Sequence, residues 1–278
     1  MDSAERSCYA HAMVSDGLQV ERARERRILF FTCSAHALVH AYMLVYSAVR
    51  EPMRQSFGLE LDDFLAYASL SNIFFGLGAV PSGLLSDRLG EKTLLVACFL
   101  VSGIGSLIVA AATAPWALGL GMIVMGAGVS IYHPVGLSLI SKGFAQPGRA
   151  MGVNGFWGSA GTALGPIVAV QCAGLAIFAS WFGEAEAWRS SYLVLAVPSI
   201  FIGLCLMRSD IRARDEARRG DGDADSNSAS AGKPAASSAP IVVFAVLLLA
   251  MTCGGFYFHL ITAALPKYCE SNVSFFQG

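Results

Sequence analysis

Apolar residues gather along the chain into long, uninterrupted runs that are separated by short polar stretches. Seven runs have the length that a helix needs to cross a bilayer, about 20 residues for a hydrocarbon core of about 30 Å, and none of them contains Asp, Glu, Lys or Arg. We predict a transmembrane helix in each run, because backbone groups in lipid must be hydrogen-bonded within their own segment. The seven predicted helices cover approximately residues 28–49, 64–85, 93–113, 116–140, 150–179, 190–207 and 241–265.

The polar stretches divide the chain into four parts. Residues 1–27 form a polar N-terminal segment, which lacks the short apolar run of a signal peptide. Residues 28–207 hold six predicted helices. Residues 208–240 are first charged and then rich in Ser, Ala and Gly, which predicts a flexible linker. Residues 241–278 hold the seventh helix, so the predicted fold is an all-α polytopic membrane protein with a six-helix bundle and one further helix.

Composition supports a membrane protein and excludes several other classes. Hydrophobic residues make up 55% of the 278 residues and charged residues 14%, against about 25% charged in soluble domains, and mean hydropathy is +0.56. The net charge of −1 gives no basic field for nucleic acid. The seven cysteines form no C-x-x-C pair, which argues against a disulfide framework or a zinc site.

Motifs of enzymes and pumps are also missing from the sequence. It contains no H-E-x-x-H, no P-loop, no G-x-S-x-G and no acidic metal cluster. We therefore predict that the protein is not an enzyme and binds no metal or other cofactor. Any transport that it performs is expected to draw on a gradient rather than on ATP.

Lys and Arg predict the orientation in the membrane. Cytoplasmic loops carry an excess of these residues. With the N-terminus in the cytoplasm, residues 1–27, the second and fourth connections and the linker 208–240 lie inside and hold most of the 19 basic residues. The outer side, including Glu51 to Asp62, holds Arg50, Arg54, Arg189 and Lys267. This bias predicts a multi-pass protein of the cell membrane with a cytoplasmic N-terminus.

The turn between the second and third predicted helices carries a recognisable pattern. It reads Gly-Leu-Leu-Ser-Asp-Arg-Leu-Gly-Glu-Lys from Gly83 to Lys92. A glycine at position 83 permits close approach of a neighbouring helix, and one at position 90 allows backbone conformations that other residues resist. The turn resembles the signature loop of the major facilitator superfamily, in which the matching positions act in conformational switching. These positions are Gly83, Asp87, Arg88, Gly90 and Lys92; Glu91 stands where the family usually has a basic residue.

The fifth predicted helix supports the same resemblance. Gly161-Thr-Ala-Leu-Gly165-Pro166 is similar to a G-x-x-x-G-P motif of proton-driven antiporters, although the paired glycines that usually follow are replaced by Ala and Val. In physical terms Gly161 and Gly165 form a small ridge for helix packing, and Pro166 can bend the helix. The fourth helix carries Tyr132-His133-Pro134, which together with residues 155–166 resembles the fosmidomycin-resistance-like branch of the superfamily.

Histidines supply the candidate cavity residues, because the first and fourth helices usually line the cavity in this family. His36 and His40 are four residues apart and therefore share one helix face. His133 lies in the fourth helix, beside a proline that disturbs regular hydrogen bonding. Ionisable side chains at membrane depth predict function, although a neutral histidine bonded to a neighbouring helix is the alternative for each. Asn154 and Trp157 lie on the face of Gly161 in the fifth helix and can meet either substrate or another helix.

The resemblance implies a secondary active transporter of a small solute that works by alternating access, with proton-coupled efflux as the expected mode. The expected partners are the solute, the lipid bilayer and the proton, and nucleic acid is not expected. Because one helix follows the linker, we expect a truncated chain that needs a second transporter half or another copy. The alternative is a non-transporting membrane sensor or scaffold.

Overall fold

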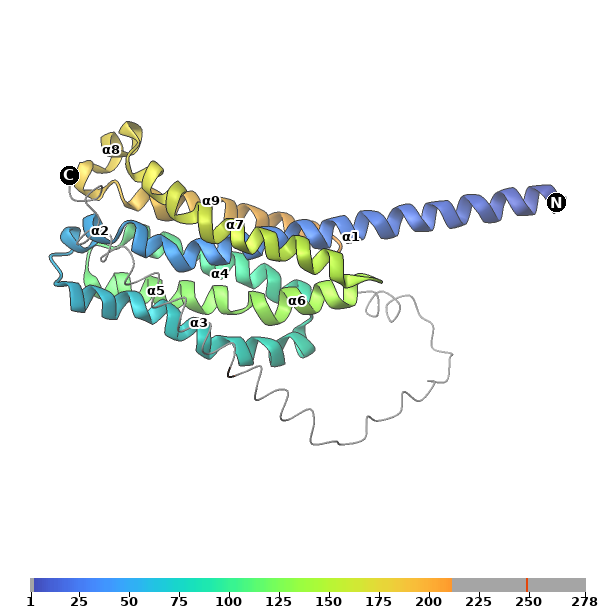
Figure 1. The fold of residues 1–278 in the computed structure, drawn as a ribbon, viewed down its shortest axis with the longest axis horizontal. Coiled ribbons are helices and arrows are strands. Elements are labelled where there is room, and N and C mark those ends of the chain that lie inside the picture. Colours follow the sequence, from blue (N-terminus) through green and yellow to red (C-terminus); the bar gives the residue numbers. More distant parts are fainter. Residues whose placement is uncertain (1–2, 212–248, 250–278) are drawn as a thin grey trace. The chain divides into compact units, whose positions relative to one another are not determined.

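The computed structural model of the protein describes residues 3–211 and residue 249. The described part before residue 212 consists of helices joined by short connections (Figure 1). The predicted seventh helix and almost all of the predicted linker lie outside the described residues. The long helices are α1 (Ser3–Ala48), α3 (Leu61–Leu89), α4 (Glu91–Ala111), α5 (Pro115–Ser130), α6 (Tyr132–Gly143), α7 (Pro147–Ala173) and α9 (Arg189–Arg208). The short ones are α2 (Arg50–Ser56), α8 (Ala176–Phe182) and a 3₁₀ turn, η1 (Glu184–Glu186).

Six apolar segments of this part can cross a membrane. Five are long enough and apolar enough by themselves, namely those in α1, α3, α4, α5 with α6, and α9. The sixth is α7 together with α8, which are bent by 63° relative to each other. Each of the first six predicted helices corresponds to one of these segments, so the predicted all-α polytopic membrane fold is confirmed.

The helices differ from the prediction at three places. Helix α1 begins at Ser3 and not near residue 28, because charged residues such as Glu21 and Arg24 pair along the helix and continue it beyond the apolar part. The fourth predicted helix is interrupted at Ile131. Pro134 explains this break, since its missing N–H leaves the preceding turn without a hydrogen bond. The fifth predicted helix bends at Gly174 and Leu175. The sequence there is uniformly apolar, so its composition did not predict the bend.

Small residues bring the helices close together. Helix α1 packs along α7, while α4 packs on α5 and α9, and α3 packs on α5. A Cβ on Gly161 of α7 would collide with the backbone of Ala37 in α1, and one on Gly165 would lie 2.7 Å from the Cα of Ala41. The predicted small ridge is therefore the contact surface between α7 and α1. Pro166 lies inside α7, which continues to Ala173.

Polar contacts join the connections at one end of the bundle. Ser56, at the end of α2, donates a hydrogen bond to Glu186 at 2.6 Å. Arg189 pairs with Glu186 and also donates to the carbonyl oxygens of Ala110 and Ala112, both at 2.7 Å. The connections after α1, α4 and α7 therefore lie at the same end.

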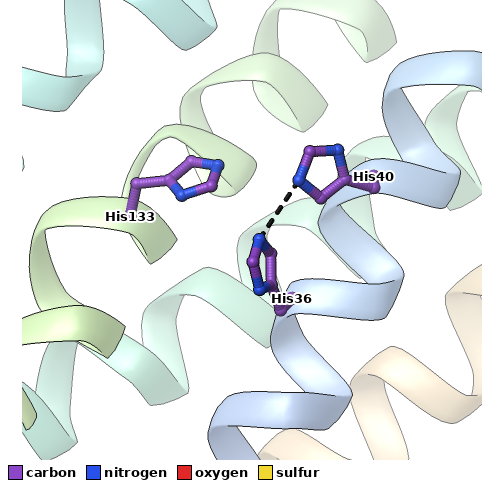
Figure 2. Close-up of side chains that lie close together, drawn as sticks. All are labelled: His36, His40 and His133. Atoms are coloured by element: carbon purple, nitrogen blue, oxygen red, sulfur yellow. Dashed lines mark hydrogen bonds between the residues drawn. The ribbon is translucent and has the colours of Figure 1, made fainter. Parts of the chain in front are cut away.

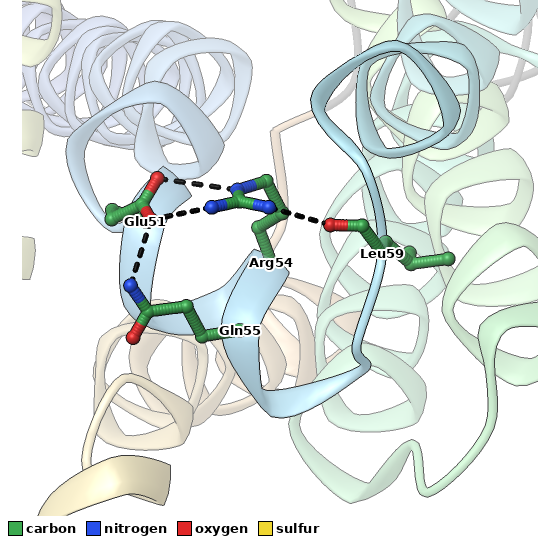
Figure 3. A network of polar contacts seen from close by, with 4 residues as sticks. All are labelled: Glu51, Arg54, Gln55 and Leu59. Atoms are coloured by element: carbon green, nitrogen blue, oxygen red, sulfur yellow. Dashed lines mark hydrogen bonds and ion pairs between the residues drawn. The ribbon is translucent and has the colours of Figure 1, made fainter.

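Helix α2 at this end was not predicted. Glu51 accepts hydrogen bonds from Arg54 and Gln55, and Arg54 also donates to the carbonyl oxygen of Leu59 at 2.7 Å (Figure 3). The hydrogen bonds from Arg54 and then Gln55 hold the pKa of the exposed Glu51 carboxyl below its usual value. The network closes the turn that leads from α1 into α3.

The other end of the bundle has its own set of contacts. Lys92, at the start of α4, donates to the carbonyl oxygen of Met207 near the end of α9 at 3.2 Å. Arg24 donates to the carbonyl oxygen of Gly143 at the end of α6. The connections therefore alternate between two ends, as consecutive membrane crossings require.

Candidate functional site

Three histidines from two helices meet inside the bundle. His36 and His40 lie one turn apart on α1, and His133 lies in the first turn of α6. Their nearest nitrogen atoms lie within 4.8 Å of one another, and the Nε2 atoms of His36 and His40 are 3.2 Å apart. Figure 2 shows the ring of His133 directed toward the other two. The structure thus brings together all three histidines that the sequence singled out.

Asn154 of α7 holds the ring of His36. The Nδ1 atom of His36 is 2.9 Å from the main-chain oxygen of Asn154 and 2.9 Å from its side-chain Oδ1. Both oxygens are acceptors, so Nδ1 must carry the hydrogen. In the neutral ring Nε2 then has the free lone pair, and His40 Nε2 donates to it. The Asn154 side chain also accepts from the Tyr132 hydroxyl at 2.8 Å, so α1, α6 and α7 share one amide.

Packing fixes the positions of these rings. A Cβ on Gly158 of α7 would lie 2.6 Å from His36 Nε2, so only glycine leaves room for the imidazole there. The rings of His36 and Tyr132 lie 4.8 Å apart, and those of His36 and His133 are perpendicular at 5.2 Å. Gly158 escaped the sequence prediction, although it extends the spacing of Gly161 and Gly165 by one turn and could have been found in that way.

The histidine cluster, defined as His36, His40 and His133, is both polar and accessible. Each of the three residues is only partly buried, whereas Asn154 and Tyr132 behind them are buried. Within the described residues, this is the group of His, Cys, Asp and Glu side chains that could hold a metal ion. Three imidazoles with a fixed neighbour can exchange protons, donate to an anion or coordinate a cation.

Trp157 does not join the cluster in this structure. Its ring is 45% exposed and packs edge-to-face on Phe156 at 6.0 Å. Asn154, on the same helix, is 1% exposed and faces α1 and α6. Of the two candidates on α7, Asn154 therefore contacts the histidine cluster and Trp157 does not. A substrate contact by either residue stays a prediction.

The signature loop forms the tight turn between α3 and α4. Gly90 has φ of 81°, a conformation that L side chains rarely adopt and that a glycine at this position allows. A Cβ on Gly83 would make an ordinary contact with Pro134 at 3.6 Å, so glycine is permitted there but not required. Asp87 and Arg88 are exposed and make no hydrogen bond or ion pair with other described residues.

Glu91, the residue that departs from the family pattern, has its own partners. Its side chain is 5% exposed, and Oε1 accepts from Lys142 of α6 at 2.5 Å and from Ser138 at 3.1 Å. An acidic residue at this position thus replaces the usual basic one by pairing α4 with α6.

Known proteins are similar to this chain in sequence and in fold. The family description "Major Facilitator Superfamily" matches residues 30–275. A gentisate transporter from Corynebacterium glutamicum is 25% identical over 181 residues, which are 65% of this chain and 39% of that protein.

Solved structures give the same fold. A bacterial homologue of the human lysosomal transporter Spinster, inward-facing and unoccupied, has a TM-score of 0.62 at 17% identity and covers 75% of this chain and 46% of its own. Its inward-facing, occupied structure has a TM-score of 0.58 at 18% identity, over 68% of this chain and 44% of its own. The chain spans less than half the length of these relatives. The match over most of its length, with six apolar crossings, shows that this multi-pass membrane protein belongs to the Major Facilitator Superfamily.

Proposed function

We propose that the chain is a secondary active transporter, rather than an enzyme, and moves a small solute by alternating access coupled to protons. The histidine cluster carries the proposal. It places three ionisable side chains within 4.8 Å of one another, between helices that are otherwise apolar. The likeness to a gentisate transporter supports a small organic solute, and the Gly161 to Pro166 motif supports exchange of a proton for the solute, hence efflux.

The path of a transported solute must be enclosed by protein on the side that the described helices leave open. Polar side chains at membrane depth require water or protein partners, and the cluster histidines are partly exposed in the bundle. We propose that a second six-helix half or another copy of the chain encloses this side of the path. The mass of the purified chain in detergent separates a monomer from a dimer.

The test of function uses everted membrane vesicles from cells that naturally make the protein, deleted for its gene and complemented with variants. A proton gradient is imposed across the vesicle membrane and followed with a pH-sensitive dye. Its dissipation is measured when gentisate, or one of a panel of small organic acids and cations, is added. We expect His133→Ala to lower solute-dependent proton movement about tenfold or more, because it removes one titrating ring. His259→Ala, a histidine outside the described residues, is the control and is expected to stay within about twofold.

Two results would contradict the proposal. No solute-dependent proton movement in wild-type vesicles, compared with the deletion, would leave no transport to explain. Unchanged rate and pH dependence in His133→Ala would make this histidine a packing residue.

We also propose that the N-terminus is cytoplasmic and that the protein resides in the cell membrane. Of the described basic residues after Glu21, only Arg50, Arg54 and Arg189 lie at the end of the bundle that holds α2 and η1; the others gather at the opposite end. Cysteines at exposed Glu60 and Ala145, in a background without native cysteines, test this orientation. An impermeant maleimide should label position 60 on intact cells and position 145 only after lysis; the reverse would invert the topology.

A further inference from the structure

The histidine cluster has a feature that proton exchange does not require: three imidazole donors converge on one point. We propose that His36, His40 and His133 bind a divalent first-row transition-metal ion such as Zn²⁺. The sequence predicted no metal site, because His133 is far from the other two along the chain. This inference uses the residues of the proposed function but does not depend on transport.

The donor set selects the class of ion. Imidazole nitrogen suits Zn, Cu, Fe and Ni, whereas Mg²⁺ and Ca²⁺ prefer carboxylate and carbonyl oxygen. The cluster supplies three ring nitrogens and no carboxylate. Two histidines four residues apart on a helix, as His36 and His40 are, form a common pair of zinc ligands.

The spacing is close to what a tetrahedral site needs. Zinc binds histidine nitrogen at about 2.0–2.1 Å, which places two ligands of a tetrahedron about 3.3–3.4 Å apart. The Nε2 atoms of His36 and His40 are 3.2 Å apart. One ring nitrogen from each of the three residues lies within 4.8 Å of the other two, so the His133 ring has only a short distance to move.

His36 is prepared to act as a ligand. Its Nδ1 hydrogen is donated to Asn154, which leaves the lone pair of Nε2 facing His40. A hydrogen bond at the second ring nitrogen is the usual way in which proteins orient a metal-binding histidine. Tyr132 in turn orients the Asn154 side chain, and Gly158 leaves space for the ring. This supporting set is one that a histidine used only for packing does not need.

Binding requires one rearrangement of a proton. His40 Nε2 donates to His36 Nε2 in the neutral cluster. To coordinate an ion through Nε2, His40 must carry its ring proton on Nδ1, so a tautomer change accompanies binding and no net proton is lost. Because the three residues are only partly buried, a fourth position stays open to water or to a solute, as in sites where zinc binds exchangeable ligands.

The experiment titrates Co²⁺, a visible probe of tetrahedral sites, into the full chain in detergent, purified with a tag that lacks histidine. We expect d–d absorption that saturates at one ion per chain and is abolished by excess Zn²⁺. His133→Ala should weaken the affinity about tenfold or more, and His259→Ala should leave it unchanged. His133→Cys guards against misfolding: a thiolate can replace the imidazole, so binding should persist with a new sulfur-to-cobalt charge-transfer band.

The outcomes separate this inference from the proposed function. Absence of saturable Co²⁺ absorption in the folded wild type would overturn the inference, and so would equal affinity in His133→Ala or a missing charge-transfer band in His133→Cys. Proton-coupled flux in the same protein would then leave the proposed function standing. Metal binding without such flux would support the inference and remove the proposed function.

Discussion

The short helix α6 carries two polar clusters that are built in opposite ways. At its start, His133 meets His36 and His40 in a group without any carboxylate. Near its end, Lys142 and Ser138 hold the carboxylate of Glu91. The first cluster is partly exposed and consists of rings that can exchange protons or ligands, whereas the second is an ion pair around a buried carboxylate. One helix thus carries a group of histidines at its start and an ion pair near its end.

The two clusters are also stabilised by different forces. The histidine cluster depends on shape, because Gly158 and Gly161 allow α7 to approach α1 closely enough for Asn154 to reach His36. The Glu91 cluster depends on charge, because a carboxylate that is 5% exposed needs its cation. This difference indicates that the ion pair fixes the position of α6, while α1 and α7 determine the surroundings of its histidine. Two substitutions test the division.

The larger effect is expected for Gly161→Leu. A side chain there would collide with the backbone of Ala37 and force α7 away from α1. Overpacking usually costs about 1–3 kcal/mol of stability, and a collision with backbone favours the upper value. We therefore expect Gly161→Leu to lose about 3 kcal/mol of stability and also to lose Co²⁺ binding by the histidine cluster. Thermal unfolding in detergent and Co²⁺ titration measure the two effects.

Gly155 provides the matched control on the same helix. It is exposed, and a Cβ there meets nothing within 4 Å. Gly155→Leu should therefore change neither stability nor binding. Equal damage from both substitutions would mean that α7 resists leucine for a reason other than its contact with α1.

A smaller effect is expected for Lys142→Met. Among the described residues, it leaves the buried Glu91 carboxylate with Ser138 as its side-chain partner. Because the Lys142 side chain is 45% exposed, solvent screens the pair, and we expect a loss of about 1–2 kcal/mol. Adding Glu91→Leu should recover most of it, since an apolar pair can replace a buried ion pair. The free energy of unfolding measures both variants, with the exposed Arg149→Met as control.

Two results would contradict this comparison of the two clusters. If Lys142→Met left stability intact but removed Co²⁺ binding, the ion pair would act on the histidines and not only as an anchor. If the double variant were less stable than either single variant, Glu91 would have a role beyond pairing with Lys142.

Sequence reasoning found the apolar crossings, and it noted that Gly90 allows unusual backbone conformations, since both follow from local chemistry. It also placed His36 and His40 on one face, because four residues nearly complete a helical turn. It did not find the pairing of Glu91 with Lys142 or the junction at Asn154, because each joins helices whose mutual rotation depends on packing. The bend at Gly174 was missed for another reason: apolar composition shows that a segment prefers lipid but not where its axis turns.

The shared amide of Asn154 has a consequence for how this sequence can evolve. One side-chain oxygen accepts from both Tyr132 and His36. Glutamine would carry the amide one methylene too far, and aspartate would add a charge beside a buried hydroxyl. We therefore expect the fitness effect of a substitution at position 154 to depend on the residues at positions 132 and 36, so that three sites distant in the chain drift under one shared constraint.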